Sequence, residues 1–187
     1  MTDCAFIAIT SFASVGAALA AIASVFLSWR GIQEQNKQSQ KSREDFRLSL
    51  AADLAMKLED RFDTKEQRKI RARASQALLT NSGLRETEDI FDFFETIGLL
   101  LRNGALYPDL AYNFFFHWIN LYWIAGEGYI QTERNTSNTL WENFEFAFHT
   151  VCKIEQQRDP KSIDLKLTSS SNRIKDLLQD EINREAE

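Results

Sequence analysis

A short row of polar side chains interrupts the most apolar stretch of the chain. Asn113, His117 and Asn120 are separated by four and three residues, so on a helix they would share one face. Because histidine titrates near neutral pH, such a row could bind a ligand or respond to protons. We favour the alternative of a structural seam, hydrogen-bonded to a neighbouring helix or to water, because an unpaired buried polar group costs about 1–3 kcal/mol.

A second candidate is a charged edge formed by Asp92, Glu95 and Arg102. Paired carboxylates can act as acid and base or bind a metal ion. A di-iron bundle would need a Glu-x-x-His motif on another helix, and the sequence has none. The pair Glu145 and His149, one helical turn apart, does not make a site by itself. We therefore interpret the edge as ion pairing or solvation.

The sequence lacks the patterns that are typical of catalysis. It has no Ser-His-Asp arrangement, Gly-rich phosphate loop or Walker motif, and its 2 cysteines form no CxxC. A metal-dependent hydrolase would require Asp92, Glu95, His117 or His149 to converge. We predict no enzyme activity, no cofactor and no metal. With 22 basic and 27 acidic residues, the chain also lacks the positive charge typical of nucleic-acid binding.

The polar row lies on an expected helix, residues 108–125, that is apolar almost all round. Such a helix is normally buried, docked on a partner or in contact with lipid. A second membrane span is disfavoured, because its two asparagines and one histidine are costly in a bilayer. Since large aromatic residues are enriched at interfaces, we predict a candidate interface at Phe115, Phe116 and Trp123.

The N-terminal region contains 26 residues without a charge, from Cys4 to Trp29. About 20 apolar residues in a helix are enough to cross a bilayer. A cleavable signal peptide would need a basic start and a shorter apolar core, and an amphipathic surface helix would need a charged face. A buried helix would be unusually long. We therefore expect a single membrane-spanning helix.

Basic residues follow this stretch but do not precede it. The positive-inside rule therefore places the C-terminal part in the cytoplasm. Small residues spaced by four would also let two such helices approach closely, so a homo-oligomer through the span is a further expectation. The five basic residues are Arg30, Lys37, Lys41, Arg43 and Arg47, and the small residues are Ala13, Ala17 and Ala21 and, on a second stripe, Gly16, Ala20, Ser24 and Ser28.

Helical periodicity and the absence of strand-like alternation predict an all-α fold. We expect a transmembrane anchor at 1–29, a polar stalk at 30–45, a bundle of about five helices at 46–157, and a loose segment with one short amphipathic helix at 158–187. The expected bundle helices run from Phe46 to Phe62, from Asp63 or Thr64 to 81–83, from Thr87 to Asn103, over 108–125 up to Gly126 and Gly128, and from Asn135 or Thr136 to before Pro160; the last helix covers 172–184.

Two details of this bundle can be checked directly. The first bundle helix has an apolar residue every four positions and should bury that stripe, which consists of Phe46, Leu50, Leu54, Leu58 and Phe62. A glycine inside a helix costs about 1 kcal/mol relative to alanine, so Gly98 should permit close contact with another helix.

The motif D-F-F-E-x-I-G-x-L-x-x-x-G, which begins at Asp92 and ends at Gly104, and the block L-W-E-N-F-E at 140–145 together resemble a known family. The family consists of small bacterial proteins and is described only as a domain of unknown function. The resemblance covers roughly residues 5–157. It implies bacterial origin, an N-terminal membrane helix, a polar stalk and a helical cytoplasmic domain, and it brings no catalytic residues.

Two functions fit these observations. We prefer a membrane-anchored cytoplasmic module for protein interaction or regulation at the bacterial inner membrane, whose protein partner the sequence does not identify. The alternative is a membrane-acting effector of stress or phage defence, in which the span itself is the active part. Overexpression distinguishes them, because an effector should arrest growth and depolarise the membrane.

Overall fold

The computed structural model describes the backbone of residues 3–184 and the side chains of Trp29, Arg30 and residues 32–184. All secondary structure in this part of the chain is helical, which confirms the all-α prediction. The elements, in chain order, are α1 (Asp3–Phe62), α2 (Lys65–Thr80), the 3-10 turn η1 (Leu84–Thr87), α3 (Glu88–Arg102), α4 (Pro108–Arg134), α5 (Glu142–Arg158), the 3-10 turn η2 (Asp164–Lys166) and α6 (Asn172–Asn183).

The chain divides into two compact units, Met1–Arg47 and Leu48–Glu187. No helix built from the described residues has both the length and the apolar character that crossing a membrane requires. The predicted span at 4–29 falls, except for Trp29, on side chains outside the described residues. The span therefore stays a prediction.

Several helix boundaries follow from local sequence. Thr64 caps α2 by accepting a hydrogen bond from the backbone N–H of Gln67 (3.3 Å), as the capping pattern predicts. Asn81 follows α2 in the left-handed conformation, with φ of 50°. Gly104 follows α3 with φ of 67°, a value that glycine adopts without strain, and α4 begins at Pro108.

Two boundaries differ from the prediction. α4 continues past Gly126 to Arg134, because Gly126 lies inside the packed core rather than at a helix end. A Cβ atom there would lie 2.3 Å from Cζ of Phe91. α5 begins only at Glu142, several residues later than expected, because contacts from α3 fix its first turn.

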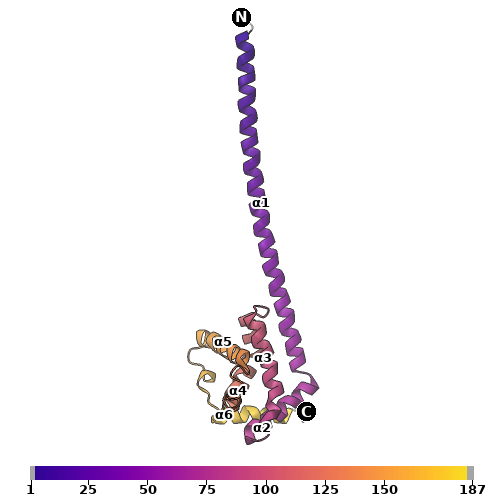
Figure 1. The fold of residues 1–187 in the computed structure, drawn as a ribbon, viewed down its shortest axis with the longest axis vertical. Helices are drawn as coiled ribbons and strands as arrows, with labels where there is room; N and C mark the ends of the chain where they lie inside the picture. Colours follow the sequence, from indigo (N-terminus) through magenta and orange to yellow (C-terminus); the bar gives the residue numbers. More distant parts are fainter. Residues whose placement is uncertain (1–2, 185–187) are drawn as a thin grey trace. The chain divides into compact units, whose positions relative to one another are not determined.

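The core of the second unit is built around α3, whose apolar arc is buried between its neighbours. α3 packs against α5, α4 and α2, and α6 packs mainly against α2 (Figure 1). Aromatic rings fill the interior: Phe94 stacks on Phe144 with ring centroids 5.1 Å apart, and Phe62 stacks on Phe93 at 4.9 Å. The wide apolar face of α3 therefore predicts its central position correctly.

The apolar stripe expected on the first bundle helix is only partly buried. Leu58 and Phe62 are buried and Leu54 is half-buried, whereas Phe46 and Leu50 are 70% and 57% exposed. The prediction is therefore wrong for these last two residues. Among the α1 side chains that the structure describes, the buried ones all lie at position 51 or beyond. The spacing of four therefore begins before the part of the helix that the bundle covers.

The C-terminal segment 158–187, which we expected to be loose, contains the predicted amphipathic helix as α6. Its apolar residues Ile174 and Leu178 are buried, and Glu181 on the same face is buried as well. α6 is therefore a packed part of the second unit rather than a loose appendage, because it brings both an apolar face and a buried polar contact to α2.

Candidate functional site

The predicted polar row on α4 does not act as one unit. The Asn113 side-chain oxygen accepts a hydrogen bond from Nη1 of Arg158 (3.1 Å), whereas Asn120 is buried and bonds elsewhere. His117 is exposed, with its ring edge-on to that of Trp118 at 4.9 Å. Packing removes part of its hydration and lowers the pKa of His117, so the imidazole is mostly neutral at pH 7. The favoured interpretation of the row as a structural seam, and the alternative of a ligand-binding row, both stay predictions.

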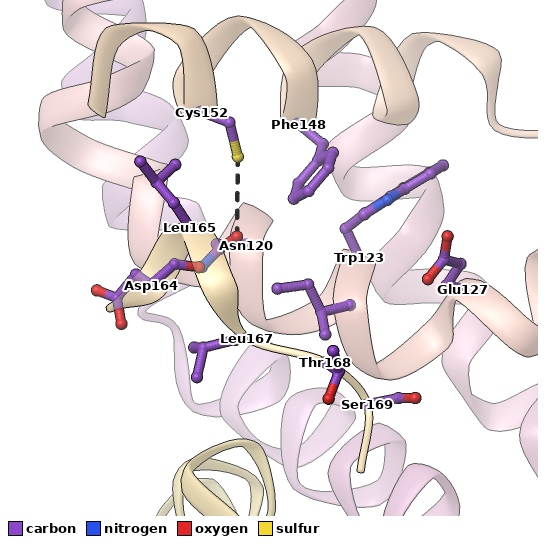
Figure 2. Close-up of a pocket in the computed structure, with 11 residues that line it drawn as sticks. Asn120, Trp123, Glu127, Phe148, Cys152, Asp164, Leu165, Leu167, Thr168 and Ser169 are labelled. Atoms are coloured by element: carbon purple, nitrogen blue, oxygen red, sulfur yellow. Dashed lines mark hydrogen bonds between the residues drawn. The ribbon is translucent and has the colours of Figure 1, made fainter. Parts of the chain in front are cut away.

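Asn120 lines a cavity of about 270 Å³ between α4, α5 and the segment around η2 (Figure 2). Its side-chain nitrogen donates a hydrogen bond to the backbone oxygen of Asp164 (3.2 Å). Its oxygen accepts a weak hydrogen bond from the Cys152 thiol (3.8 Å), which points toward it in Figure 2. The remaining lining residues are Trp123, Ile124, Glu127, Phe148, Leu165, Leu167, Thr168 and Ser169.

The reactive thiol at this cavity is held in its protonated form, beside an aromatic wall. Burial, with a smaller contribution from Glu155, raises the pKa of the Cys152 thiol to about 12, so the thiolate that would act as nucleophile or metal ligand is scarce at pH 7. Trp123 and Phe148 stack with ring centroids 5.4 Å apart and give the cavity an aromatic wall. The Asn120 amide beside this wall is already hydrogen-bonded to Asp164 and Cys152.

The predicted charged edge contacts the first turn of α5. Oδ1 of Asp92 accepts a hydrogen bond from Nε1 of Trp141 (2.8 Å), and Nη1 of Arg102 lies 3.1 Å from Oε1 of Glu142. In the part of the chain that the structure describes, no three His, Cys, Asp or Glu side chains gather closely enough to hold a metal ion. The edge residues instead bond to residues 141–144 at the start of α5.

Glu95 caps α5 from a different helix. The residue before α5, Trp141, has a left-handed backbone (φ 53°), and its side chain accepts no hydrogen bond from the first turn. Oε2 of Glu95 accepts one from the backbone N–H of Phe144 (2.7 Å), and Oε1 accepts one from Nδ2 of Asn143 (2.6 Å). Because the free N–H groups at a helix start attract negative charge, this carboxylate stabilises α5 and joins it to α3.

Gly98 brings the backbone of α3 against the same turn. A Cβ atom at this position would lie 1.8 Å from the backbone oxygen of Asn143, far closer than non-bonded atoms approach. The prediction that Gly98 permits close helix contact is therefore confirmed. We call the contact of Asp92, Glu95, Gly98 and Arg102 with residues 141–144 the α3–α5 lock.

The candidate aromatic interface on α4 requires a correction. Phe115 and Trp123 are buried, and Phe116 is half-buried. Phe115 lies 6.1 Å from Phe93, centroid to centroid, and Trp123 meets Phe144 edge-on at 5.2 Å, so both rings are part of the core. These residues do not form an exposed surface, because α4 is covered by α3, α5 and α6.

A buried ion pair between α2 and α6 could not be predicted from the sequence. Nε of Arg71 on α2 donates a 2.7 Å hydrogen bond to Oε2 of Glu181 on α6, and the two side chains are only 3% and 2% exposed. Arg71 also donates to the backbone oxygen of Phe62 and lies over its ring, 4.3 Å from the centroid. The two partners are 110 positions apart, so no local spacing indicates the pair.

Exposed apolar side chains are concentrated on α1. Among the described residues, nine large hydrophobic side chains are exposed, and six of them lie on this helix. Ile32 is 57% exposed, and Phe46 and Leu50 have already been noted. Apolar groups gathered on one element are typical of an interaction surface. The six are Trp29, Ile32, Phe46, Leu48, Leu50 and Met56.

A family model described as a domain of unknown function (DUF4760) matches residues 12–146, which is more than half of the chain. The chain belongs to this family. The match confirms the resemblance based on the D-F-F-E core. No curated protein and no solved structure matches the chain.

The DUF4760 domain includes the α3–α5 lock and the exposed side chains of α1, whereas η2 and α6 lie beyond its last matched residue. The description names neither a host organism nor a membrane anchor, so both stay predictions.

Proposed function

We propose that the chain is a membrane-anchored helical module that binds another protein chain through α1 and has no catalytic activity of its own. The observation that supports this most is the exposure of Ile32, Phe46 and Leu50, at 57–70% each, on one helix. Water-exposed apolar groups on a single element favour association, because burying them removes apolar area from water.

The membrane anchor in this proposal is the uncharged stretch at 4–29. Its length suits one crossing of the hydrocarbon core, and the basic residues that follow it favour a cytoplasmic position for the rest of the chain. In this proposal the membrane is the bacterial inner membrane. A tether of this kind raises the local concentration of α1 helices for any partner in the same membrane.

The absence of catalysis in this proposal is supported by the state of the reactive groups. The carboxylates of Asp92 and Glu95 are engaged in the α3–α5 lock. The Cys152 thiol is mostly protonated at pH 7, and the His117 ring packs edge-on against Trp118. A protein whose polar groups serve its own fold is better suited to binding than to turnover.

The test combines fractionation with site-specific crosslinking of the full chain in cells. We expect the chain to remain in the membrane pellet after carbonate extraction. A photo-crosslinking amino acid at Ile32 should give a protein adduct, and the same amino acid at Lys41, on the opposite side of α1, should give much less. Extraction into the supernatant would contradict the anchor, and equal adducts at the two positions would contradict the interaction surface.

A further inference from the structure

Four of the six exposed apolar residues of α1 fall into one heptad frame. Trp29, Ile32, Phe46 and Leu50 occupy positions of a series in which the steps alternate between three and four residues, and the complete series is 29, 32, 36, 39, 43, 46 and 50. This alternation places side chains in a single seam along a helix and is the spacing of a coiled coil. We call these seven positions the α1 seam.

The middle of the seam is polar, and its polar side chains favour pairing with an identical helix in register. Asn36, Ser39 and Arg43 separate the two apolar ends. If two copies align in register, apolar residues meet apolar residues at both ends, and the Asn36 amide meets another amide, which can both donate and accept. A polar residue at such a position costs stability but fixes register. Arg43 can pack its stem and extend its charge into water.

The positions beside the seam also permit pairing of two copies. In a parallel coiled coil, the residue directly before the first seam position of each heptad faces the residue five positions later on the other helix. Gln35 would therefore face Gln40, and Ser42 would face Arg47. No like charges meet at these flanking positions.

We propose that the partner of α1 is a second copy of this chain, paired in parallel and in register through the α1 seam. The proposal deepens the proposed function, because two copies anchored in one membrane would present their helices in the same direction. The seam lies within the matched family domain, so the pairing surface is part of that domain rather than an addition to it.

The test uses disulfide crosslinking of the full chain in isolated membranes, with both native cysteines replaced by serine. Asn36→Cys lies in the seam, and Lys41→Cys lies on the outer side of the same helix. Mild oxidation should convert most of the Asn36→Cys chain, and little of the Lys41→Cys chain, to a covalent dimer. Equal dimer yields, or no dimer from Asn36→Cys, would overturn the proposal. A dimer formed only between Asn36→Cys and Ser39→Cys chains would overturn the parallel arrangement.

A second pair of variants separates the seam from general exposure. Phe46 lies in the seam and Leu48 lies opposite it, and both are more than half exposed, so lysine at either position leaves the bundle core intact. Added to Asn36→Cys, Phe46→Lys should lower the dimer yield at least tenfold, and Leu48→Lys should change it less than twofold. Similar effects of the two would overturn the seam.

The outcome also separates this inference from the proposed function. If Asn36→Cys forms no dimer while Ile32 still crosslinks to a different protein, the partner is not a second copy, and the interaction module stands. If no position on α1 crosslinks to any protein, both proposals fail.

Discussion

Replacing Glu95 by alanine tests whether α5 depends on a cap that comes from another helix. The substitution removes the acceptor of two hydrogen bonds, from Phe144 N–H at 2.7 Å and from Asn143 Nδ2 at 2.6 Å. Hydrogen bonds to charged groups contribute about 1.5–3 kcal/mol each, and the two share one carboxylate. Because Phe144 is buried, its N–H has little access to replacement water. We therefore expect the free energy of unfolding to fall by about 2–4 kcal/mol.

The measurement is denaturant unfolding of the full chain in a mild detergent, followed by near-ultraviolet circular dichroism. Hydrogen exchange should also show faster exchange of the Phe144 amide, because the start of α5 loses its cap. Glu95→Gln, which keeps the shape but places an N–H₂ group beside two donors, should show a smaller loss. Glu59→Ala on the exposed side of α1 is the matched control. A loss from Glu95→Ala no greater than that of the control would refute the capping argument.

Three further predictions concern packing, buried charge and the thiol. Gly98→Ala should lower the melting temperature, because its Cβ would overlap the facing backbone. Gly128→Ala, whose Cβ would have nothing within 4 Å, should raise stability by up to about 1 kcal/mol. Shifts of the same sign would contradict the packing argument. Glu181→Met should cost about 3–5 kcal/mol, because the buried Arg71 charge would keep only the exposed carboxylate of Asp63, 3.8 Å away. Adding Arg71→Met should restore much of this loss, and additive losses in a double-mutant cycle would contradict the argument. The thiol is tested with the other cysteine replaced by serine. At pH 8, Cys152 should react with iodoacetamide roughly a thousandfold more slowly in the folded than in the unfolded chain, because folding raises its pKa from 9.0 to about 12. Comparable rates would exclude such a shift. The same shift predicts that the contribution of this thiol to stability is constant below pH 9 and declines between pH 9 and about 12, where only the unfolded thiol ionises.

Boundaries set by neighbouring residues were predictable from the sequence. Thr64 accepts a hydrogen bond from the backbone N–H of Gln67, three positions later. Pro108 occupies the first position of α4, where no N–H donor is needed. The central place of α3 was also predictable, because half of its circumference is apolar. In each case the decisive information lies within a few residues of the feature.

Features fixed by distant residues were not predictable in the same way. α5 starts at Glu142 because Glu95, on another helix, supplies its cap. In the sequence, Gly126 indicates a helix end. In the structure, the ring of Phe91 occupies the space that a side chain at Gly126 would fill. The aromatic residues of α4 suggested an interface, but composition alone does not distinguish a helix covered by its own fold from one covered by a partner.

The position of the last matched family residue has a practical consequence for anyone who isolates this domain. Residue 146 lies within the second turn of α5, which continues to Arg158, and the carboxylate that neutralises Arg71 lies still further along the chain. A fragment that ends at the last matched residue would stop within α5 and would lack Glu181, the buried partner of the Arg71 guanidinium. We therefore expect a stable fragment to extend at least to Glu181, well beyond the last matched family residue.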